Sequence, residues 1–233
     1  CINDNKVFGY IKVSNKNGDG LPLLANYISQ IRHREKEKNL IKGFAIDRVY
    51  YNITGFGMVV SGITGVDVNK GSSMFMGPFK GNEFIPVKIR SIHNDYRHFV
   101  DKLATGVRGC LCIRVDDKYK PFLRMGMVIC NKVSDVNSVK KFHAHVAIFR
   151  GKSSNIRVGF NSYINIGLAR GGIKFNRFRN PETKEDVDGM LESKLTLVDL
   201  EFMTHHNAIN VNDKFLFRSG RVNGLGKVVS ITV

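Results

Sequence analysis

The sequence predicts a mainly β protein, with two consecutive antiparallel β-barrels behind a short α/β unit. Three observations support this fold class. From residue 44 onward, short apolar segments follow one another, and glycine-containing turns separate them. A polar stretch at 131–139 divides these segments into two sets. Before residue 44 the pattern differs, because apolar residues recur there at helical spacing.

Residues 5–43 predict a strand, a polar glycine-containing loop and an amphipathic helix, in that order. Val7–Val13 is the apolar stretch expected as the strand. Asp19 is a suitable helix cap, and Pro22 is compatible with the first helical turn. One strand and one helix cannot close a core, so we expect them to end a larger domain. Since no initiating Met opens the chain, we also expect it to begin within a longer protein.

The apolar segments recur at the spacing that is typical of antiparallel barrels. The first set occupies residues 44–51, 57–63, 73–77, 84–92, 109–115 and 125–130. The second set occupies residues 141–149, 162–168, 172–178, 192–202, 214–220 and 226–233. We therefore predict three parts: 1–43 as the end of an α/β domain with a linker, 44–135 as one barrel, and 136–233 as another.

The charge balance is strongly basic, with 36 Lys and Arg against 20 Asp and Glu and a net charge of +16. A positive field attracts polyanions, and RNA is the commonest one in the cytoplasm. A generally basic, soluble surface is the alternative. No apolar run approaches the ~20 residues of a membrane helix, so we expect no membrane partner and a cytoplasmic location.

The four cysteines show no spacing typical of a disulfide framework. Cys110 and Cys112 alternate within an apolar segment and are expected to be core thiols in a reducing compartment. His143 and His145 also alternate on an expected strand. Neither pair has a further ligand at a convincing spacing, so we predict no metal site.

Both sets of segments contain recognisable motifs. The first set reads F-A-I-D-R-V at 44–49, G-F-G-M-V-V-S-G at 55–62 and V-K-I-R-S-I-H at 87–93. The second set opens with F-H-A-H-V at 142–146 and closes with F-R-S-G-R-V-N-G-L-G-K-V at 217–228. These motifs resemble the second and third domains of translational GTPases of the elongation-factor-Tu/1-alpha type, and they are most similar to the GTP-binding protein 1 and 2 subfamily. The resemblance implies two Greek-key β-barrels that follow the end of a GTPase domain.

The sequence departs from that pattern at Met58, where Thr is usual, and at Ser219, where Glu is common. The stretch V-S-N-K at 13–16 resembles the fifth guanine-nucleotide motif of the family. The resemblance implies that Ser14, Asn15 and Lys16 contact the guanine base in an intact parent, which uses GTP and Mg²⁺. Taken by itself, this stretch is only a flexible turn.

The motifs of phosphate chemistry are missing from the sequence. It contains no P-loop G-x-x-x-x-G-K-[ST] and no D-x-x-G before the first barrel. It also lacks N-K-x-D, because the spacing from Asn131 and Lys132 to Asp135 is one residue too long for that motif. No nucleophile, acid–base or paired-carboxylate pattern stands out either. We therefore predict no catalytic residue, and we expect neither GTP hydrolysis nor a bound cofactor from this chain alone, although the parent is expected to be a GTPase.

Basic residues near aromatic residues are candidates for nucleic-acid contact. They gather at 90–99 and 170–179, where Arg and Lys side chains can bind phosphates while exposed aromatic rings stack on bases. Phe175 and Phe178 are expected to pack in the core instead. The resemblance adds two residues of the closing motif. The candidate contacts are Arg90, Arg97, Lys174, Arg177, Arg179, Arg218 and Arg221.

These observations favour the C-terminal part of a translation-factor-like GTP-binding protein. Its barrels would bind RNA, either tRNA or the ribosome, and couple that binding to the GTP state of an upstream G domain. The alternative is a basic barrel module for nucleic-acid or protein interaction, such as a virion-associated one, without GTPase function. The abundance of Asn, Ile and Lys suits an AT-rich genome, and a giant-virus member would act in the host cytoplasm.

Overall fold

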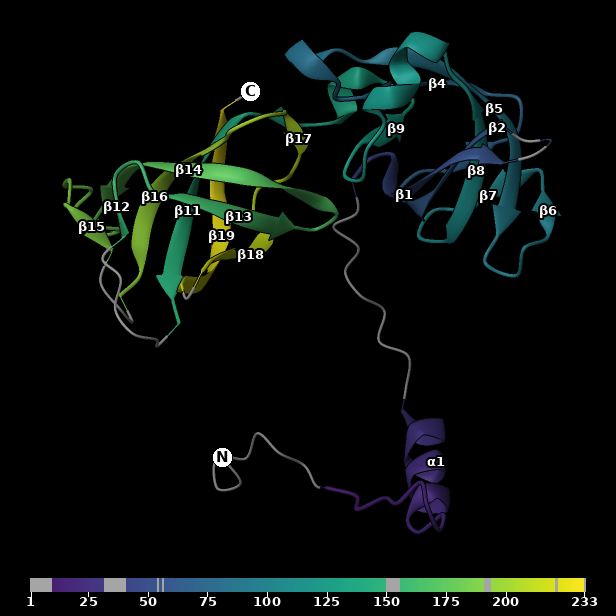
Figure 1. The fold of residues 1–233 in the computed structure, drawn as a ribbon, viewed down its shortest axis with the longest axis horizontal. Helices are drawn as coiled ribbons and strands as arrows, with labels where there is room; N and C mark the ends of the chain where they lie inside the picture. Colours follow the sequence, from purple (N-terminus) through teal and green to yellow (C-terminus); the bar gives the residue numbers. More distant parts are fainter. Residues whose placement is uncertain are drawn as a thin grey trace. The chain divides into compact units, whose positions relative to one another are not determined.

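The computed structural model describes residues 10–31, 41–53, 55, 57–149, 156–190, 194–220 and 222–232, with only the backbone of Asn52. The chain divides into two compact units, Cys1–Lys38 and Asn39–Val233. The first unit contains the helix α1 (Leu21–Gln30), and the second contains the described strands (Figure 1). No helix in the described part of the chain is long and apolar enough to cross a membrane.

Helix α1 begins at a glycine rather than at the predicted cap residue. Gly20 is the N-cap, with a left-handed φ of 74°, and no side chain caps the helix. A Cβ at this position would stand 2.0 Å from the carbonyl oxygen of Lys12, so the close approach of the backbone requires glycine. Asp19 is therefore not the cap, whereas Pro22 lies in the first turn as predicted.

The expected strand at Val7–Val13 is not formed over its described residues, 10–13, which carry no regular structure. A strand needs a hydrogen-bonded neighbour, and the described residues of the first unit contain no second strand. No residue of α1 is buried, and Leu23, Tyr27 and Ile28 are exposed. The apolar face of the helix therefore has no partner within the described residues of its own unit.

The first barrel is a closed antiparallel sheet of six strands. Its strands are β1 (Phe44–Ile53), β2 (Gly57–Thr64), β4 (Ser73–Gly77), β5 (Ile85–Asn94), β8 (Arg108–Arg114) and β9 (Val128–Cys130). They run in the order β4-β9-β1-β2-β8-β5, and pairing of β5 with β4 closes the sheet. Buried and exposed residues alternate along β2 and β5, so one face of each strand fills the core.

Short elements decorate the first barrel. They are β3 (Val68–Asn69) paired with β7 (Lys102–Leu103), β6 (Phe99–Val100) paired with β5, and the 3₁₀ helices η1 (Lys80–Asn82), η2 (Asp117–Phe122) and η3 (Val133–Asp135). Asp116 caps η2 by accepting a hydrogen bond from the N–H of Lys118 at 3.2 Å. The acidic pair at 116–117 therefore begins a helical turn.

The second barrel is also closed and antiparallel, with six strands (Figure 1). Its strands are β11 (Lys141–Ile148), β13 (Asn161–Ile166), β14 (Ala169–Arg179), β16 (Thr196–Phe202), β18 (Lys214–Ser219) and β19 (Val222–Thr232). They run in the order β11-β16-β14-β13-β18-β19, and β19 pairs with β11. Two short ladders accompany them: β10 (Ser138–Val139) with β17 (Asn207–Ala208), and β12 (Ile156–Arg157) with β15 (Gly189–Met190).

Each barrel encloses its own apolar core. Phe175 and Phe178 are buried in the second core, as the alternation of their strand predicted. The expectation of two barrels is thereby confirmed. The boundaries at 43/44 and 135/136 stay predictions. Of the two alternating cysteines, Cys112 is buried but Cys110 is only half-buried.

A third, smaller apolar cluster joins the end of the first barrel to the start of the second. It contains Val128, Cys130, Val136 and Ala208, and Ile41 and Phe84 pack against it. Polar contacts accompany it, since the hydroxyl of Ser138 donates to the side-chain oxygen of Asn82. Burial, with a smaller effect from Asp135, raises the pKa of the Cys130 thiol to about 11. The connection between the two barrels is therefore packed by apolar side chains and is more than a covalent link.

Candidate nucleic-acid interface

Exposed cations line the outer surface of the second barrel, on the strands β14, β18 and β19. We call this surface the basic face and define it by five exposed residues: Arg170, Lys174, Lys214, Arg218 and Lys227. Strand register places them on one side of the sheet. Lys214 lies directly opposite Lys227, Arg218 lies opposite Tyr163, and Lys174 lies opposite Asn161, two residues from Tyr163 on β13.

The pair of Lys214 and Lys227 is the most unusual feature of the basic face. Neighbouring antiparallel strands lie about 4.8 Å apart, and like charges directly opposite each other destabilise a sheet. On its other side, Lys227 lies opposite His145, which adds no negative charge. Neither lysine forms an ion pair within the part of the chain that the structure describes. An anion held between the two ammonium groups would relieve their repulsion.

Exposed apolar side chains lie beside these cations. Leu216 and Leu225 are paired across β18 and β19, and both are exposed. Tyr163 lies on the next strand with 52 % of its surface accessible. An exposed tyrosine opposite Arg218 provides a ring on which an unpaired base can stack while the guanidinium meets a phosphate.

Two predicted contact residues on β14 already have acidic partners. Arg177 binds Asp186 through Nε and Nη2, at 2.6 and 2.9 Å, and this pairing lowers the pKa of Asp186. Arg179 donates through Nη2 to Asp199, whose carboxylate also lies 2.6 Å from Nδ1 of His143. The charges of Arg177 and Arg179 are therefore largely neutralised, and the hydrophilic loop at 180–190 is tied to its strand through Asp186.

The other two predicted cations belong to the first barrel. Arg90 is exposed at a register shift of β5, between Ile89 and Ser91. Arg97 lies in the turn between β5 and β6 with a φ of 64°. The side-chain oxygen of Asn94 shapes this turn by accepting hydrogen bonds from the N–H groups of Tyr96 and His98, both at 3.0 Å. Arg97 is therefore exposed to solvent. It belongs to the first barrel, whereas the basic face belongs to the second.

The last predicted cation, Arg221, lies outside the described residues. The predicted guanine-contacting residues Ser14, Asn15 and Lys16 form a compact loop before α1. The N–H of Ser14 donates to the carbonyl oxygen of Asp19 at 3.0 Å, and its own carbonyl accepts from the N–H of Gly18 at 2.9 Å. Within the described residues, the N–H groups of Asn15 and Lys16 make no hydrogen bond, so they can donate to a ligand.

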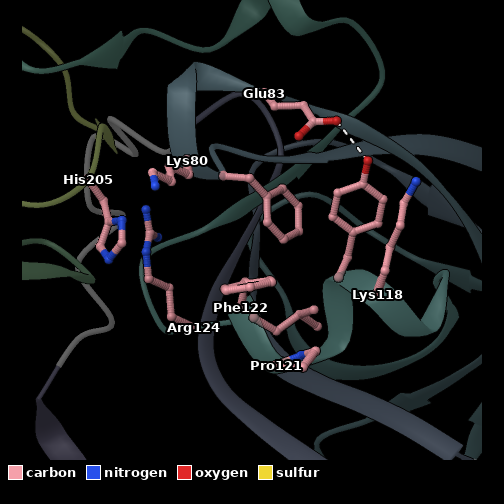
Figure 2. A pocket seen from close by; sticks show the side chains of 10 residues that line it. Lys80, Glu83, Lys118, Pro121, Phe122, Arg124 and His205 are labelled. Atoms are coloured by element: carbon pink, nitrogen blue, oxygen red, sulfur yellow. Dashed lines mark hydrogen bonds between the residues drawn. The ribbon is translucent and has the colours of Figure 1, made fainter.

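The structure also contains a pocket that the sequence did not predict. A cavity of about 670 Å³ is lined by Phe79, Lys80, Glu83, Lys118, Tyr119, Pro121, Phe122, Leu123, Arg124 and His205. We call it the aromatic pocket. Figure 2 shows Lys80, Arg124 and His205 near one end of it and Lys118 near the other. The hydroxyl of Tyr119 donates a hydrogen bond to Oε1 of Glu83 at 2.8 Å. Glu83 is the acidic residue among those that line the pocket.

Sequence reasoning missed this pocket because its walls come from three separated segments. The available signal was the run K-Y-K-P-F at 118–122, which puts two aromatic residues into an otherwise polar connection. An exposed aromatic residue in such a loop is more informative than one in a strand. As for metals, the described residues contain no cluster of three or more His, Cys, Asp and Glu side chains that could hold an ion.

Comparisons with known proteins agree with the resemblance in both sequence and fold. No protein-family model matches the sequence. GTP-binding protein 2 from Mus musculus and from Homo sapiens are each 22 % identical to the chain over 233 residues, which is 98 % of this chain and 37 % of theirs. The chain thus spans little more than a third of the length of these relatives.

Solved structures match the fold of the chain. Crystal structures of sup35 complexed with GDP and with GMPPNP each superimpose with a TM-score of 0.66 and 20 % identity. Each match covers 90 % of this chain and 52 % of the sup35 chain. The chain therefore shares its fold, with two closed antiparallel barrels, with part of sup35, and its sequence is similar to part of GTP-binding protein 2.

Proposed function

We propose that the chain is the RNA-binding part of a GTP-binding translation-factor-like protein, and that its basic face contacts the phosphates of tRNA or of ribosomal RNA. The observation that carries the proposal is the direct opposition of Lys214 and Lys227 across β18 and β19. Two unpaired ammonium groups at that spacing cost stability unless an anion lies between them. Lys174 and Arg218, on the same side of the sheet, extend the contact along the barrel.

The proposal assigns different roles to the remaining predicted cations. Arg90 and Arg97 are secondary phosphate contacts on the first barrel. Arg177 and Arg179 position the strand β14 through their acidic partners, Asp186 and Asp199. Arg221 belongs to the same closing motif as Arg218 and is proposed as a further phosphate contact on the basis of sequence alone.

In the intact parent, an upstream G domain would bind GTP with Mg²⁺, and Ser14, Asn15 and Lys16 would contact the guanine base. The N–H groups of Asn15 and Lys16, which make no hydrogen bond to the residues that the structure describes, suit this role because a base carbonyl oxygen can accept from them. GTP would supply the β–γ phosphoanhydride bond whose hydrolysis resets such a protein. The exposed apolar face of α1 is proposed to pack against the rest of that domain. Rotation of the G domain against the barrels would couple RNA binding to the nucleotide state.

A salt-titrated binding assay tests the proposal. Fluorescently labelled tRNA and a random-sequence RNA duplex of similar length are each titrated with the chain at several salt concentrations. We expect tighter binding of tRNA and a logarithmic salt dependence whose slope reflects several phosphate contacts. Equal binding of both RNAs with a steep slope would indicate a nonspecific basic module instead, and absence of binding would refute RNA recognition altogether.

A further inference from the structure

The aromatic pocket contains a hydrogen-bond donor without an acceptor. Nη2 of Arg124 donates to the carbonyl oxygens of Pro78 and His206, at 3.0 and 2.9 Å. Nη1 of the same guanidinium is buried and has no hydrogen-bond partner among the described residues. A buried charged donor left unpaired is costly, so a rotation of the Arg124 guanidinium that brings Nη1 to an acceptor in the pocket would be favourable.

The rest of the wall is aromatic. The rings of Phe79 and Tyr119 are packed with their centroids 5.2 Å apart, and Nζ of Lys118 lies 4.8 Å from the centroid of Tyr119. Phe122 has 65 % of its surface accessible at the mouth of the pocket. The exposure of the Phe122 ring to water is unfavourable, and a flat apolar group stacked on it would remove that cost. Exposed aromatic surfaces of this kind bind the faces of nucleobases.

Positive charge accompanies the rings. Lys80, Arg124 and His205 lie near one end of the pocket, as Figure 2 shows, and Lys118 lies near the other. The pKa of His205 is lowered, first by burial and then by the charges of Arg124 and Lys140, so His205 favours its neutral form and the positive charge at this end comes from Lys80 and Arg124. Glu83 already accepts a hydrogen bond from Tyr119. The pocket therefore combines an apolar stacking surface with a cationic end, which matches a base attached to a phosphate.

We propose that the aromatic pocket holds one unpaired nucleotide of an RNA strand, with the base against the aromatic wall and a phosphate toward Lys80 and Arg124. The volume of about 670 Å³ is within the range of pockets that enclose small ligands. An aliphatic side chain from a protein partner would cover Phe122 but would leave Nη1 of Arg124 unpaired. A nucleotide satisfies both, because it has a π face and strong acceptor oxygens.

This inference rests on the proposed RNA binding, although the pocket and the basic face are separate sets of residues. The chain contains no Trp, so Phe122→Trp introduces a single fluorescent reporter at the mouth of the pocket. The probe is a twelve-nucleotide single-stranded poly-uridine or poly-adenosine RNA. We expect saturable quenching of the reporter. Phe149→Trp is the matched control, because Phe149 is also an exposed phenylalanine but lies outside the pocket, and its fluorescence should not change.

Affinity measurements complete the test. Phe122→Ala should weaken binding of the twelve-nucleotide RNA by about five- to a hundredfold, the usual loss when one stacking ring is removed. Lys80→Ala should weaken it less and reduce the salt slope. Phe149→Ala should leave both quantities unchanged. Equal affinities for Phe122→Ala and Phe149→Ala would overturn the inference.

The outcomes separate this inference from the proposed function. If Lys174→Ala and Arg218→Ala weaken tRNA binding while the pocket variants do not, the basic face is the RNA site and the pocket inference fails. If free adenosine or uridine monophosphate quenches the Phe122→Trp reporter but the RNA strand does not, the pocket binds free nucleotides and the inference also fails. If neither RNA binds, both proposals fail.

Discussion

Nη2 of Arg124 donates a hydrogen bond to the carbonyl oxygen of His206 at 2.9 Å, which ties the connection before β9 in the first barrel to the segment before β17. The same nitrogen also reaches the carbonyl oxygen of Pro78. Arg124 thus holds two segments of the chain as well as the wall of the aromatic pocket. Burial lowers the pKa of its guanidinium, but the group stays charged at neutral pH.

Replacing Arg124 should destabilise the barrels. Arg124→Ala removes both hydrogen bonds and leaves two carbonyl oxygens without their donor, so we expect the free energy of unfolding to fall by about 1–3 kcal/mol. Urea denaturation followed by circular dichroism measures this. Arg90→Ala is the control, because Arg90 is exposed and should change stability by less than about 0.5 kcal/mol. Equal urea midpoints for Arg124→Ala and Arg90→Ala would show that the hydrogen bonds of Arg124 do not stabilise the barrels.

Removing one of the two facing lysines, Lys214 or Lys227, should raise the stability of the free chain but reduce the salt dependence of its RNA binding. Lys227→Gln removes one charge of the pair, so at low salt the free chain should gain about 0.2–1 kcal/mol of stability. The same variant should reduce the logarithmic salt slope of tRNA binding by about one. Lys70→Gln is the control, because Lys70 is paired with Asp101 on the first barrel. A loss of stability in Lys227→Gln would show that the lysines do not repel each other.

Arg177 should matter less for RNA binding than Lys174, although both project from β14. The carboxylate of Asp186 already neutralises Arg177, whereas Lys174 has no ion pair among the described residues. We expect Lys174→Ala to weaken tRNA binding severalfold and Arg177→Ala to change it by less than twofold at the same salt concentration. Fluorescence anisotropy titrations compare them. The opposite ranking would mean that Arg177 leaves Asp186 when RNA binds.

Gly20→Ala should disrupt the loop before α1 more than Gly18→Ala does. Both glycines have a positive φ, which costs an alanine about 1–2 kcal/mol. Only at Gly20 would the added Cβ also meet a backbone oxygen, that of Lys12, whereas nothing lies within 4 Å at Gly18. Hydrogen exchange of the Ser14 amide, which is bonded to Asp19, reports the effect. We expect faster exchange in Gly20→Ala, and similar rates in the two variants would argue against the close approach.

Stability should fall at alkaline pH through Cys130. Its pKa is raised to about 11 in the folded chain, so between about pH 9 and 11 the unfolded chain loses this proton while the folded chain keeps it. The contribution of Cys130 is therefore fully present below pH 9 and is lost as the pH rises, by on the order of 2 kcal/mol. The free energy of unfolding of Cys130→Ala and of the unsubstituted chain, each measured at pH 7 and pH 10, isolates the contribution of Cys130. An identical pH dependence in both proteins would be evidence against the shift.

Much of the fold follows from local patterns in the sequence. Phe175 and Phe178 were assigned to the core because alternating residues on a strand face opposite sides, and both are buried. Lys174 was recognised as an exposed cation for the same reason, whereas Arg218, which is also exposed, came from the resemblance of the closing motif. The helix start was missed by one residue, because Asp19 has the side chain of a cap while Gly20 has the backbone conformation that the position requires.

The sites were harder to predict because they depend on register and on long-range contact. Arg179 donates to Asp199, which lies diagonally across the paired strands β14 and β16, and Arg177 is the residue directly opposite Asp199. The opposition of Lys214 and Lys227 likewise requires the register of β18 and β19. The aromatic pocket draws residues from three segments that have no common pattern. The predicted viral origin and cytoplasmic location also concern properties that the fold does not encode.

The closure of the second barrel has a consequence for its synthesis. Its first strand, β11, pairs with its last strand, β19, from Lys141 opposite Thr232 to Ile148 opposite Gly224. During translation, β11 leaves the ribosome exit tunnel long before β19 does, and until then one of its edges is unpaired. The barrel can close only after about 80 further residues have been added, a delay of several seconds at ordinary elongation rates. In that interval the open edge of β11 presents unpaired backbone N–H and C=O groups with which another chain can pair.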